Sequence, residues 1–190
     1  MEEFARGKRS VVYRDGNKII KRESLKSNAI NRIDNEVIWL RKLNKQGIGP
    51  RLLDHKEGEI TMEIVKGAQI MKWLETSHKK EMIIVLMDIL KQCRILDEMH
   101  VNKYEMTNPY KHIIIMKKKP IMIDFERCKY TRNPKNVTQF CQFLMCGKVK
   151  NILERNGIKI DRTLLKNALI DYKKEQDDDN FFRVISCINY

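Results

Sequence analysis

Hydrophobic and polar residues alternate in short runs over the first third of the chain, and turn-forming residues separate these runs. A two-residue period predicts β-strands with one buried face. The segments Asp15-Gly16-Asn17 and Glu57-Gly58-Glu59 predict tight turns, because Gly, Asn and Asp tolerate turn conformations. The expected strands lie within residues 4–13, on both sides of Gly7, and at 18–21, 52–55 and 60–65.

A helical period replaces this alternation between residues 28 and 46. Apolar residues recur there every three or four positions, at Ile30, Ile33, Val37, Leu40 and Leu43. Gly47 follows them and is suited to end a helix in the left-handed conformation. We therefore expect one helix between the third and fourth strands.

The chain beyond the Lys66-Gly67 linker is mostly helical in pattern. The segments with helical periodicity are 70–74, 80–99, 137–146, 149–156 and 162–175. The acidic run Asp177-Asp178-Asp179 is suited to cap a final turn and helix ending at Tyr190, or forms a solvated loop. The pattern as a whole predicts an α+β fold, with a β-rich part over residues 1–65 and a helical part over 66–190.

A hairpin interrupts the helical part. Two apolar runs, Ile113–Met116 and Ile121–Ile123, flank a polar turn at Lys117–Pro120. Glu105 precedes the first run and Asp124 ends the second, so we expect both acids at the same end of the sheet. With His112 beside them, they suit a hard divalent cation and its phosphate ligand. A surface hairpin with incidental charges is an equally good interpretation of these residues alone.

Two further features of the first part suggest contacts with phosphate. Lys21 shares a strand face with the apolar Ile19, and Glu36 lies at the edge of the helix's apolar stripe, within reach of a lysine on the sheet. A solvated glutamate is the common alternative. The turn Gly7-Lys8-Arg9-Ser10 can place backbone N–H groups and cations over a phosphate chain. An ordinary hairpin turn explains it as well.

The charge balance favours an anionic partner. The chain carries 38 Lys and Arg against 25 Asp and Glu, a net charge of +13, which suits nucleotide phosphates, RNA or an acidic protein surface. Scattered cysteines indicate reduced thiols. No apolar run approaches the roughly 18 residues of a membrane span, and the N-terminus lacks a signal-peptide pattern. We therefore expect a cytoplasmic protein with no membrane partner.

The order of these elements resembles that of a protein kinase. The phrases GKRSVVY, NEVIWLRKLNKQGIGP, EMTNPYKHIII, IDFER and PKNVTQF are similar to archaeal predicted serine/threonine kinases related to the RIO kinases and to the small kinase of the KEOPS complex. The resemblance implies a single, two-lobed minimal protein-kinase-like domain over residues 1–190. Its N-lobe, 1–65, would hold a five-stranded antiparallel sheet and one helix, and its C-lobe, 66–190, would be a reduced helical lobe.

The resemblance also implies a nucleotide site. Lys21 would contact the phosphates of ATP, with Glu36 as its partner on the helix. The residues that would surround the nucleotide are Gly7, Lys8, Arg9 and Ser10 in the glycine-rich loop and Met62, Glu63 and Val65 at the hinge that binds adenine.

The implied catalytic and metal-binding residues depart from the usual kinase pattern. Asp124 matches the metal ligand of the DFG motif, but Glu126 replaces its glycine. Glu105 stands where an aspartate is usual in the catalytic loop. His112 falls near the usual metal-binding asparagine, and an imidazole suits Mn²⁺ better than Mg²⁺.

These residues lead to an expected function and an alternative. We expect a phosphotransferase that uses ATP and Mg²⁺, with Mn²⁺ as a second choice, and acts on Ser/Thr of a protein, including itself. The alternative is a nucleotide-binding pseudokinase or ATPase switch in an RNA- or ribosome-related assembly. Basic clusters motivate it, namely Arg6, Lys8, Arg9 and Lys117–Lys119. A small-molecule kinase is disfavoured because little chain remains for its substrate lobe.

Overall fold

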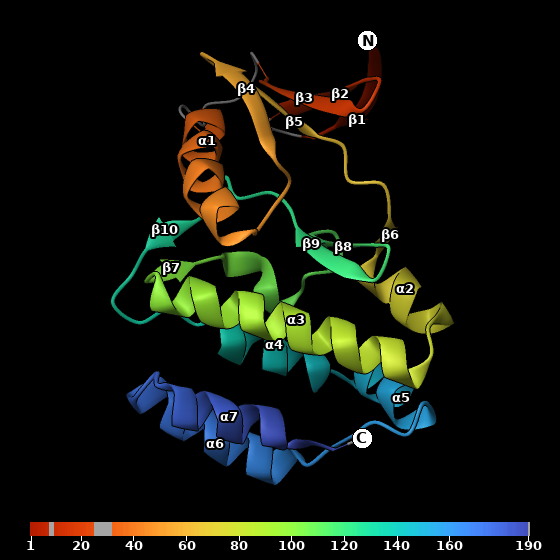
Figure 1. Cartoon of the computed structure of the whole chain (residues 1–190), viewed down its shortest axis with the longest axis vertical. Coiled ribbons are helices and arrows are strands. Elements are labelled where there is room, and N and C mark those ends of the chain that lie inside the picture. Colours follow the sequence, from red (N-terminus) through yellow and green to blue (C-terminus); the bar gives the residue numbers. More distant parts are fainter. Residues whose placement is uncertain (8–9, 25–31, 190) are drawn as a thin grey trace. The chain divides into compact units, whose positions relative to one another are not determined.

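The computed structural model describes residues 1–7, 10–24 and 32–189. The chain forms two compact units. Figure 1 shows the helices and strands, coloured along the sequence. Unit 1 contains Met1–Lys66 and Ile121–Cys128, and unit 2 contains Gly67–Pro120 and Lys129–Tyr190. The first unit therefore includes a segment from the middle of the chain.

Unit 1 is built on a five-stranded antiparallel sheet in the order β1-β2-β3-β5-β4. The five predicted strands are all present. Gly16 and Gly58 close two of the hairpins at φ of 57° and 66°, a conformation that favours glycine. The strands are β1 (Glu2–Arg6), β2 (Ser10–Asp15), β3 (Lys18–Glu23), β4 (Leu52–Lys56) and β5 (Glu59–Glu63).

The predicted helix is α1, Arg32–Leu43, followed by a short 3-10 turn and by Gly47 at φ 70°. The predicted start of this helix, at 28–31, lies outside the described residues. Its apolar stripe is buried, with Leu40 and Leu43 fully inaccessible to solvent. This burial of apolar surface attaches the helix to the unit.

The segment Ile121–Cys128 joins unit 1 through Phe125, whose side chain is fully buried. A Cβ atom at Gly49 would lie 2.9 Å from side-chain atoms of both Leu40 and Phe125. Gly49 also has φ of 85°. A larger residue there would therefore clash with the core and strain the backbone.

Unit 2 holds the remaining helices, which begin and end within two residues of their predicted bounds, except at the C-terminus. They are α2 (Ile70–Thr76), α3 (Lys79–Glu98), α4 (Asn136–Leu144), α5 (Gly147–Arg155), α6 (Arg162–Lys174) and α7 (Asp178–Ser186). The Asp177 side chain accepts a hydrogen bond from the Asn180 N–H and caps α7, so the capping interpretation of the acidic run holds for Asp177. The prediction that this helix reaches Tyr190 was wrong, because β12 (Ile188–Asn189) pairs with β11 (Lys159–Ile160) instead.

The central hairpin has a shorter turn than the sequence predicted. Its strands are β8 (Ile113–Met116) and β9 (Lys119–Met122), so only Lys117 and Lys118 form the turn. Both have positive φ, 49° and 64°, as a two-residue type I′ turn requires. The short strand β6 (Ala68–Gln69) pairs with β8, and β7 (Val101–Asn102) pairs with β10 (Lys129–Tyr130).

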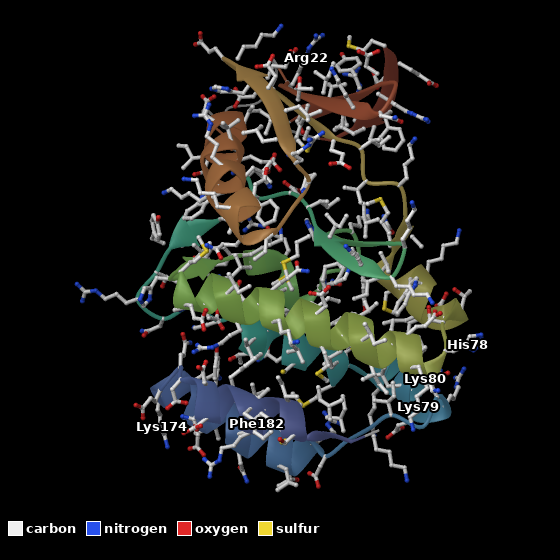
Figure 2. The ribbon with its side chains drawn as sticks, in the orientation of Figure 1. Arg22, His78, Lys79, Lys80, Lys174 and Phe182 are labelled. Atoms are coloured by element: carbon white, nitrogen blue, oxygen red, sulfur yellow. The ribbon has the colours of Figure 1, made fainter. Side chains whose placement is uncertain are left out.

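Exposed side chains carry much of the positive charge of unit 2. Lys79 and Lys80, at the start of α3, and Lys174, at the end of α6, are exposed and labelled in Figure 2. Among the described residues, no helix is long and apolar enough to cross a membrane. All five cysteines are free thiols, and burial raises the pKa of the Cys93 and Cys141 thiols well above its usual value.

A buried polar network ties together the elements of unit 2. Asp97, on α3, accepts hydrogen bonds from the Asn136 N–H and Nδ2, the Val137 N–H and the Tyr172 hydroxyl. Asn136 also donates to the Val101 carbonyl at 2.6 Å. These groups are almost inaccessible to solvent, so each needs its partner.

We predict that Asn136→Ala lowers the free energy of unfolding by about 2–4 kcal/mol, because it leaves several buried groups without partners. Urea denaturation of the full chain measures this. Asn156→Ala is the control, since the side chain of Asn156, just after α5, donates a single hydrogen bond to the Ile152 carbonyl, and its loss should cost about 1 kcal/mol or less. Equal losses in the two variants would contradict the role given to the network.

Candidate functional site

Lys21 is a buried cation at the centre of the unit 1 sheet. It lies on β3, opposite Val12 of β2 and Ile60 of β5, so it shares their face of the sheet. Only 8% of the residue is exposed. A lysine is rarely buried to this degree unless it is paired.

Glu36 is the main partner of this lysine. The Lys21 Nζ lies 2.7 Å from Glu36 Oε2, so the structure brings the two predicted residues together. The other carboxylate oxygen, Oε1, accepts the backbone N–H of Phe125 at 3.0 Å. Glu36 is 2% exposed and lies among the apolar residues of α1 rather than at their solvated edge. It therefore links the sheet, the helix and the segment that follows β9.

Two more carboxylates of that segment contact Lys21. Asp124 Oδ1 lies 3.2 Å and Glu126 Oε2 lies 3.1 Å from the ammonium nitrogen. Asp124 adopts φ of 65°, which is uncommon for a residue other than glycine and marks a constrained backbone. The sequence suggested Asp124 as a metal ligand and noted Glu126 as a departure from the kinase pattern.

Residues of α1 hold Glu126 in place. The guanidinium of Arg32 donates to Glu126 Oε1 at 3.2 Å. The Asn35 amide donates to the backbone carbonyls of Glu126 and Cys128, at 2.9 and 3.2 Å. Sequence reasoning missed Arg32, because spacing along the chain does not relate the first turn of a helix to residues more than ninety positions away.

Opposing effects act on the charge of Lys21. Burial by itself lowers the pKa of its ammonium, but the negative charges of Glu36, Asp124 and Glu126 outweigh burial and raise it. Lys21 therefore stays protonated throughout the neutral range. Ligand oxygens of the three carboxylates lie within 4.8 Å of one another, and hard oxygens of this kind fit Mg²⁺.

The residues predicted around the nucleotide belong to unit 1. The Gly7 N–H donates to the Ser10 carbonyl at 2.9 Å, which closes the β1–β2 turn. Lys8 and Arg9 lie outside the described residues. Ser10 pairs with Glu23 and shares the Lys21 face of the sheet. A backbone hydrogen bond thus joins Gly7 and Ser10, the two described residues of the predicted glycine-rich loop.

The predicted hinge lies at the end of β5. Met62 is 8% exposed and pairs with Ile19. The Glu63 N–H donates to the Arg51 carbonyl at 2.9 Å, and the Ile64 N–H donates to Asn17 at 3.1 Å. Two of the hinge amides are thus engaged within the unit.

The remaining predicted residues lie in unit 2. Glu105 is in the 3-10 helix Tyr104–Thr107, and its Oε2 lies 3.5 Å from the Nζ of Lys103. Lys103 is fully buried, and its N–H donates to Asn136 Oδ1 at 2.8 Å. His112 lies in the turn before β8, where its N–H donates to the Pro109 carbonyl. The burial of Lys103 was not predicted, although its place two residues after the apolar Val101 was a signal.

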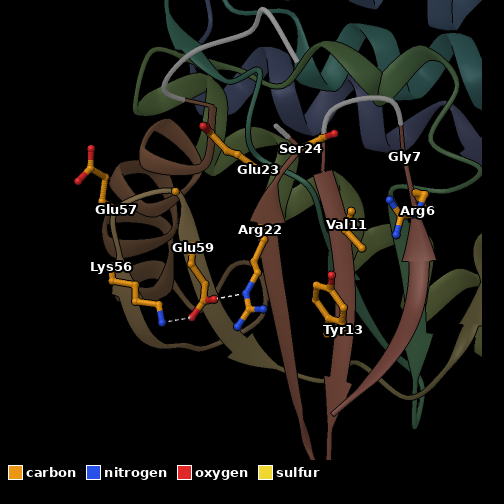
Figure 3. Close-up of a pocket in the computed structure, with 11 residues that line it drawn as sticks. Arg6, Gly7, Val11, Tyr13, Arg22, Glu23, Ser24, Lys56, Glu57 and Glu59 are labelled. Atoms are coloured by element: carbon orange, nitrogen blue, oxygen red, sulfur yellow. Dashed lines mark hydrogen bonds and ion pairs between the residues drawn. The ribbon is translucent and has the colours of Figure 1, made fainter. Parts of the chain in front are cut away.

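A hollow of about 830 Å³ in unit 1 lies on the opposite face of the sheet from Lys21 (Figure 3). Val11 and Arg22, which face each other across β2 and β3, both line it, whereas Lys21 alternates with them. Arg22 pairs with Glu59 and lies over the Tyr13 ring at 5.2 Å. The hollow is therefore separate from the carboxylate cluster around Lys21.

The basic clusters noted in the sequence are partly paired. Arg6 lies 2.6 Å from Glu3, and Lys118 lies 2.8 Å from Glu81. Lys117 and Lys119 are exposed beside Lys118 in the hairpin. Exposed ion pairs of this kind add little to stability.

We predict that Lys21→Met lowers the free energy of unfolding by about 2–4 kcal/mol, because it leaves buried Glu36 without its cation. Since the pKa of Lys21 is raised, its stabilising charge is fully present below about pH 10.4, the ordinary lysine value. The loss should therefore be constant between pH 6 and 9.

Denaturation of both proteins across this pH range measures the difference. Lys56→Met, which removes an exposed lysine 3.1 Å from Glu59, is the control and should cost about 0.5 kcal/mol or less. A loss for Lys21→Met no larger than that of the control would show that the buried pair contributes little.

Comparisons with known proteins identify the fold. No protein-family model and no curated protein sequence matches the chain. Among solved structures, the chain is similar to the crystal structure of the Rio2 kinase from Chaetomium thermophilum, with a TM-score of 0.56 and 15% sequence identity. The match covers 82% of this chain and 57% of that chain, so this chain spans little more than half of the Rio2 protein. The predicted fold class is confirmed: the chain has an α+β, kinase-like fold related to that of Rio2.

Proposed function

We propose that the protein is an ATP- and divalent-metal-dependent phosphotransferase of the RIO-like kind, acting in the cytoplasm on Ser or Thr of a protein, including itself. The observation that carries the proposal is the cluster formed by Lys21, Glu36 and Asp124 on a kinase-like fold. A strand lysine, a helix glutamate and an aspartate after a hairpin are the groups with which kinases hold nucleotide phosphates.

In this proposal Lys21 neutralises phosphate charge, and Glu36 keeps its ammonium in position. Asp124 would hold the Mg²⁺, with Glu126 close by, and the ion would draw negative charge from the phosphate oxygens. The loop from Gly7 to Ser10 would cover the phosphates. Met62, Glu63 and Val65 would surround the adenine.

Glu105 would orient the substrate hydroxyl for attack on the γ-phosphorus. Phosphoryl transfer depends mainly on placement and charge neutralisation, so a carboxylate one methylene longer than aspartate can serve if the backbone places it correctly. The hydrogen bond from the backbone N–H of Lys103 to Asn136 Oδ1 fixes the backbone two residues before Glu105. His112 would bind the metal only weakly when that metal is Mg²⁺, and better when it is Mn²⁺.

We predict that the wild-type protein, incubated with γ-labelled ATP and Mg²⁺ or Mn²⁺, transfers label to protein. Asp124→Asn should reduce the rate about a hundredfold or more, because it weakens the carboxylate ligand that would hold the divalent metal ion. Glu105→Gln should reduce it by a comparable factor while leaving ATP affinity nearly unchanged. Asp171→Asn, at a half-buried site on α6 where the carboxylate pairs with Lys174 and Arg183, should retain full activity.

Absence of labelled protein in the wild type, with ATP still bound, would contradict the kinase proposal. ATP hydrolysis without labelled protein would instead favour the ATPase switch. The net charge of +13, much of it on exposed lysines, supports an RNA-related role for such a switch. A salt titration tests that role, because affinity for an RNA backbone falls steeply as salt rises.

We predict that Lys21→Met weakens ATP binding by about tenfold or more, since it removes the cation that faces the phosphates. Isothermal titration calorimetry of the folded variant measures the affinity. Lys56→Met, on the opposite face of the sheet, should bind ATP as the wild type does. Unchanged affinity in Lys21→Met would remove Lys21 from the nucleotide site.

A further inference from the structure

We propose that Glu126 competes with nucleotide phosphate for Lys21 and so makes nucleotide binding depend on the divalent metal. The inference rests on the proposed nucleotide binding at Lys21. Glu126 replaces the glycine of the kinase DFG motif. Neither the neutralisation of phosphate charge nor the attack of the substrate hydroxyl requires a carboxylate at this position.

The first argument is the hydrogen-bonding capacity of the lysine. An ammonium group has three N–H donors. Three carboxylates lie within hydrogen-bonding distance of Lys21 Nζ, at 2.7 Å for Glu36, 3.2 Å for Asp124 and 3.1 Å for Glu126. Each donor thus has a carboxylate acceptor, and a phosphate oxygen can bond to Lys21 only by displacing one of them.

The three acceptors differ in how readily they can be displaced. Glu36 is buried and also accepts the Phe125 N–H, so its departure would disrupt the core of unit 1. Asp124, whose side chain is 38% exposed, is the acceptor that the metal would draw away. Without a metal it remains on the lysine together with Glu126.

Glu126 can leave Lys21 at a lower cost. Its Oε1 accepts a hydrogen bond from Arg32 at 3.2 Å, while its Oε2 contacts Lys21. When a phosphate takes its place on the lysine, the carboxylate still has the guanidinium as a partner. Glu126 is therefore the acceptor that a phosphate oxygen displaces. While its carboxylate remains bonded to Lys21, it opposes the binding of phosphate to that lysine.

The second argument is the charge of the cluster. Three carboxylates, those of Glu36, Asp124 and Glu126, lie around the ammonium of Lys21. A polyphosphate chain approaching Lys21 is repelled by these negative charges, and a bound divalent cation offsets the repulsion. Free nucleotide should therefore be excluded more strongly than the metal complex.

Two other roles for Glu126 make different predictions. As a third metal ligand, it would strengthen binding of the metal–nucleotide complex, and Glu126→Gln would weaken that binding specifically. As a residue that merely positions Lys21, it would support binding of both forms, and its loss would weaken both. Competition alone predicts that removing the carboxylate strengthens binding of the metal-free nucleotide.

The test is calorimetric titration of the full chain with ATP, once with EDTA and once with excess Mg²⁺. Glu126→Gln and Glu126→Ala should bind metal-free ATP about tenfold more tightly than wild type, equivalent to about 1.4 kcal/mol. Their affinity for Mg-ATP should rise by about threefold or less. The ratio between the affinities for Mg-ATP and for metal-free ATP should therefore be smaller in these variants than in the wild type. Thermal unfolding of each variant checks that the fold is retained.

Glu59→Gln is the matched control. Glu59 is a carboxylate of the same unit that also pairs with two cations, Arg22 and Lys56, but it lies on the opposite face of the sheet from Lys21. This variant should bind both forms of ATP as the wild type does. An equal gain in Glu59→Gln would point to a general effect of net charge and overturn the proposal.

The outcomes separate this inference from the proposed function. If wild type binds Mg-ATP and the Glu126 variants bind metal-free ATP no more tightly, competition is refuted and the nucleotide site stands. If wild type binds no nucleotide but a Glu126 variant does, competition is supported. If neither wild type nor variants bind nucleotide under either condition, both proposals are wrong.

Discussion

The buried ion pair between Lys21 and Glu36 is the interaction on which the rest of unit 1 depends. Removing two charges from water is costly, and only close pairing with further hydrogen bonds compensates for it. Glu36 provides these bonds by accepting both the ammonium and the Phe125 N–H. The pair therefore connects the sheet to α1 and to the segment carrying Asp124 and Glu126, so its geometry sets that of the whole cluster.

A corresponding buried carboxylate organises unit 2. Asp97 accepts four hydrogen bonds, and through Asn136 it fixes the backbone at Val101 and Lys103, just before Glu105. Both units thus use a satisfied, solvent-excluded acid to hold a loop that bears proposed functional residues. Such networks resist rearrangement because a buried carboxylate that loses some of its hydrogen-bond partners destabilises the fold more than an apolar side chain at the same place would.

The cluster around Lys21 also bears on how a reduced kinase-like fold could regulate its nucleotide. A third carboxylate in place of glycine adds negative charge where phosphate would bind, and Arg32 gives that carboxylate an alternative partner. Nucleotide affinity would then reflect competition for one ammonium group, and the metal would shift that competition by engaging Asp124.

The sequence by itself determined the five strands of the unit 1 sheet, the central hairpin, most helices and the kinase-like order of elements, because two- and 3.6-residue periods record which faces are buried. It also suggested that Lys21 and Glu36 meet, from their places on a strand and a helix. Tertiary structure alone decided what local periodicity cannot encode: the two-residue strands, the end of α7, the burial of Lys103 and the contact of Arg32 with Glu126. These depend on which distant segments pack together, and short pairings or single long-range ion pairs leave no repeating pattern in the chain.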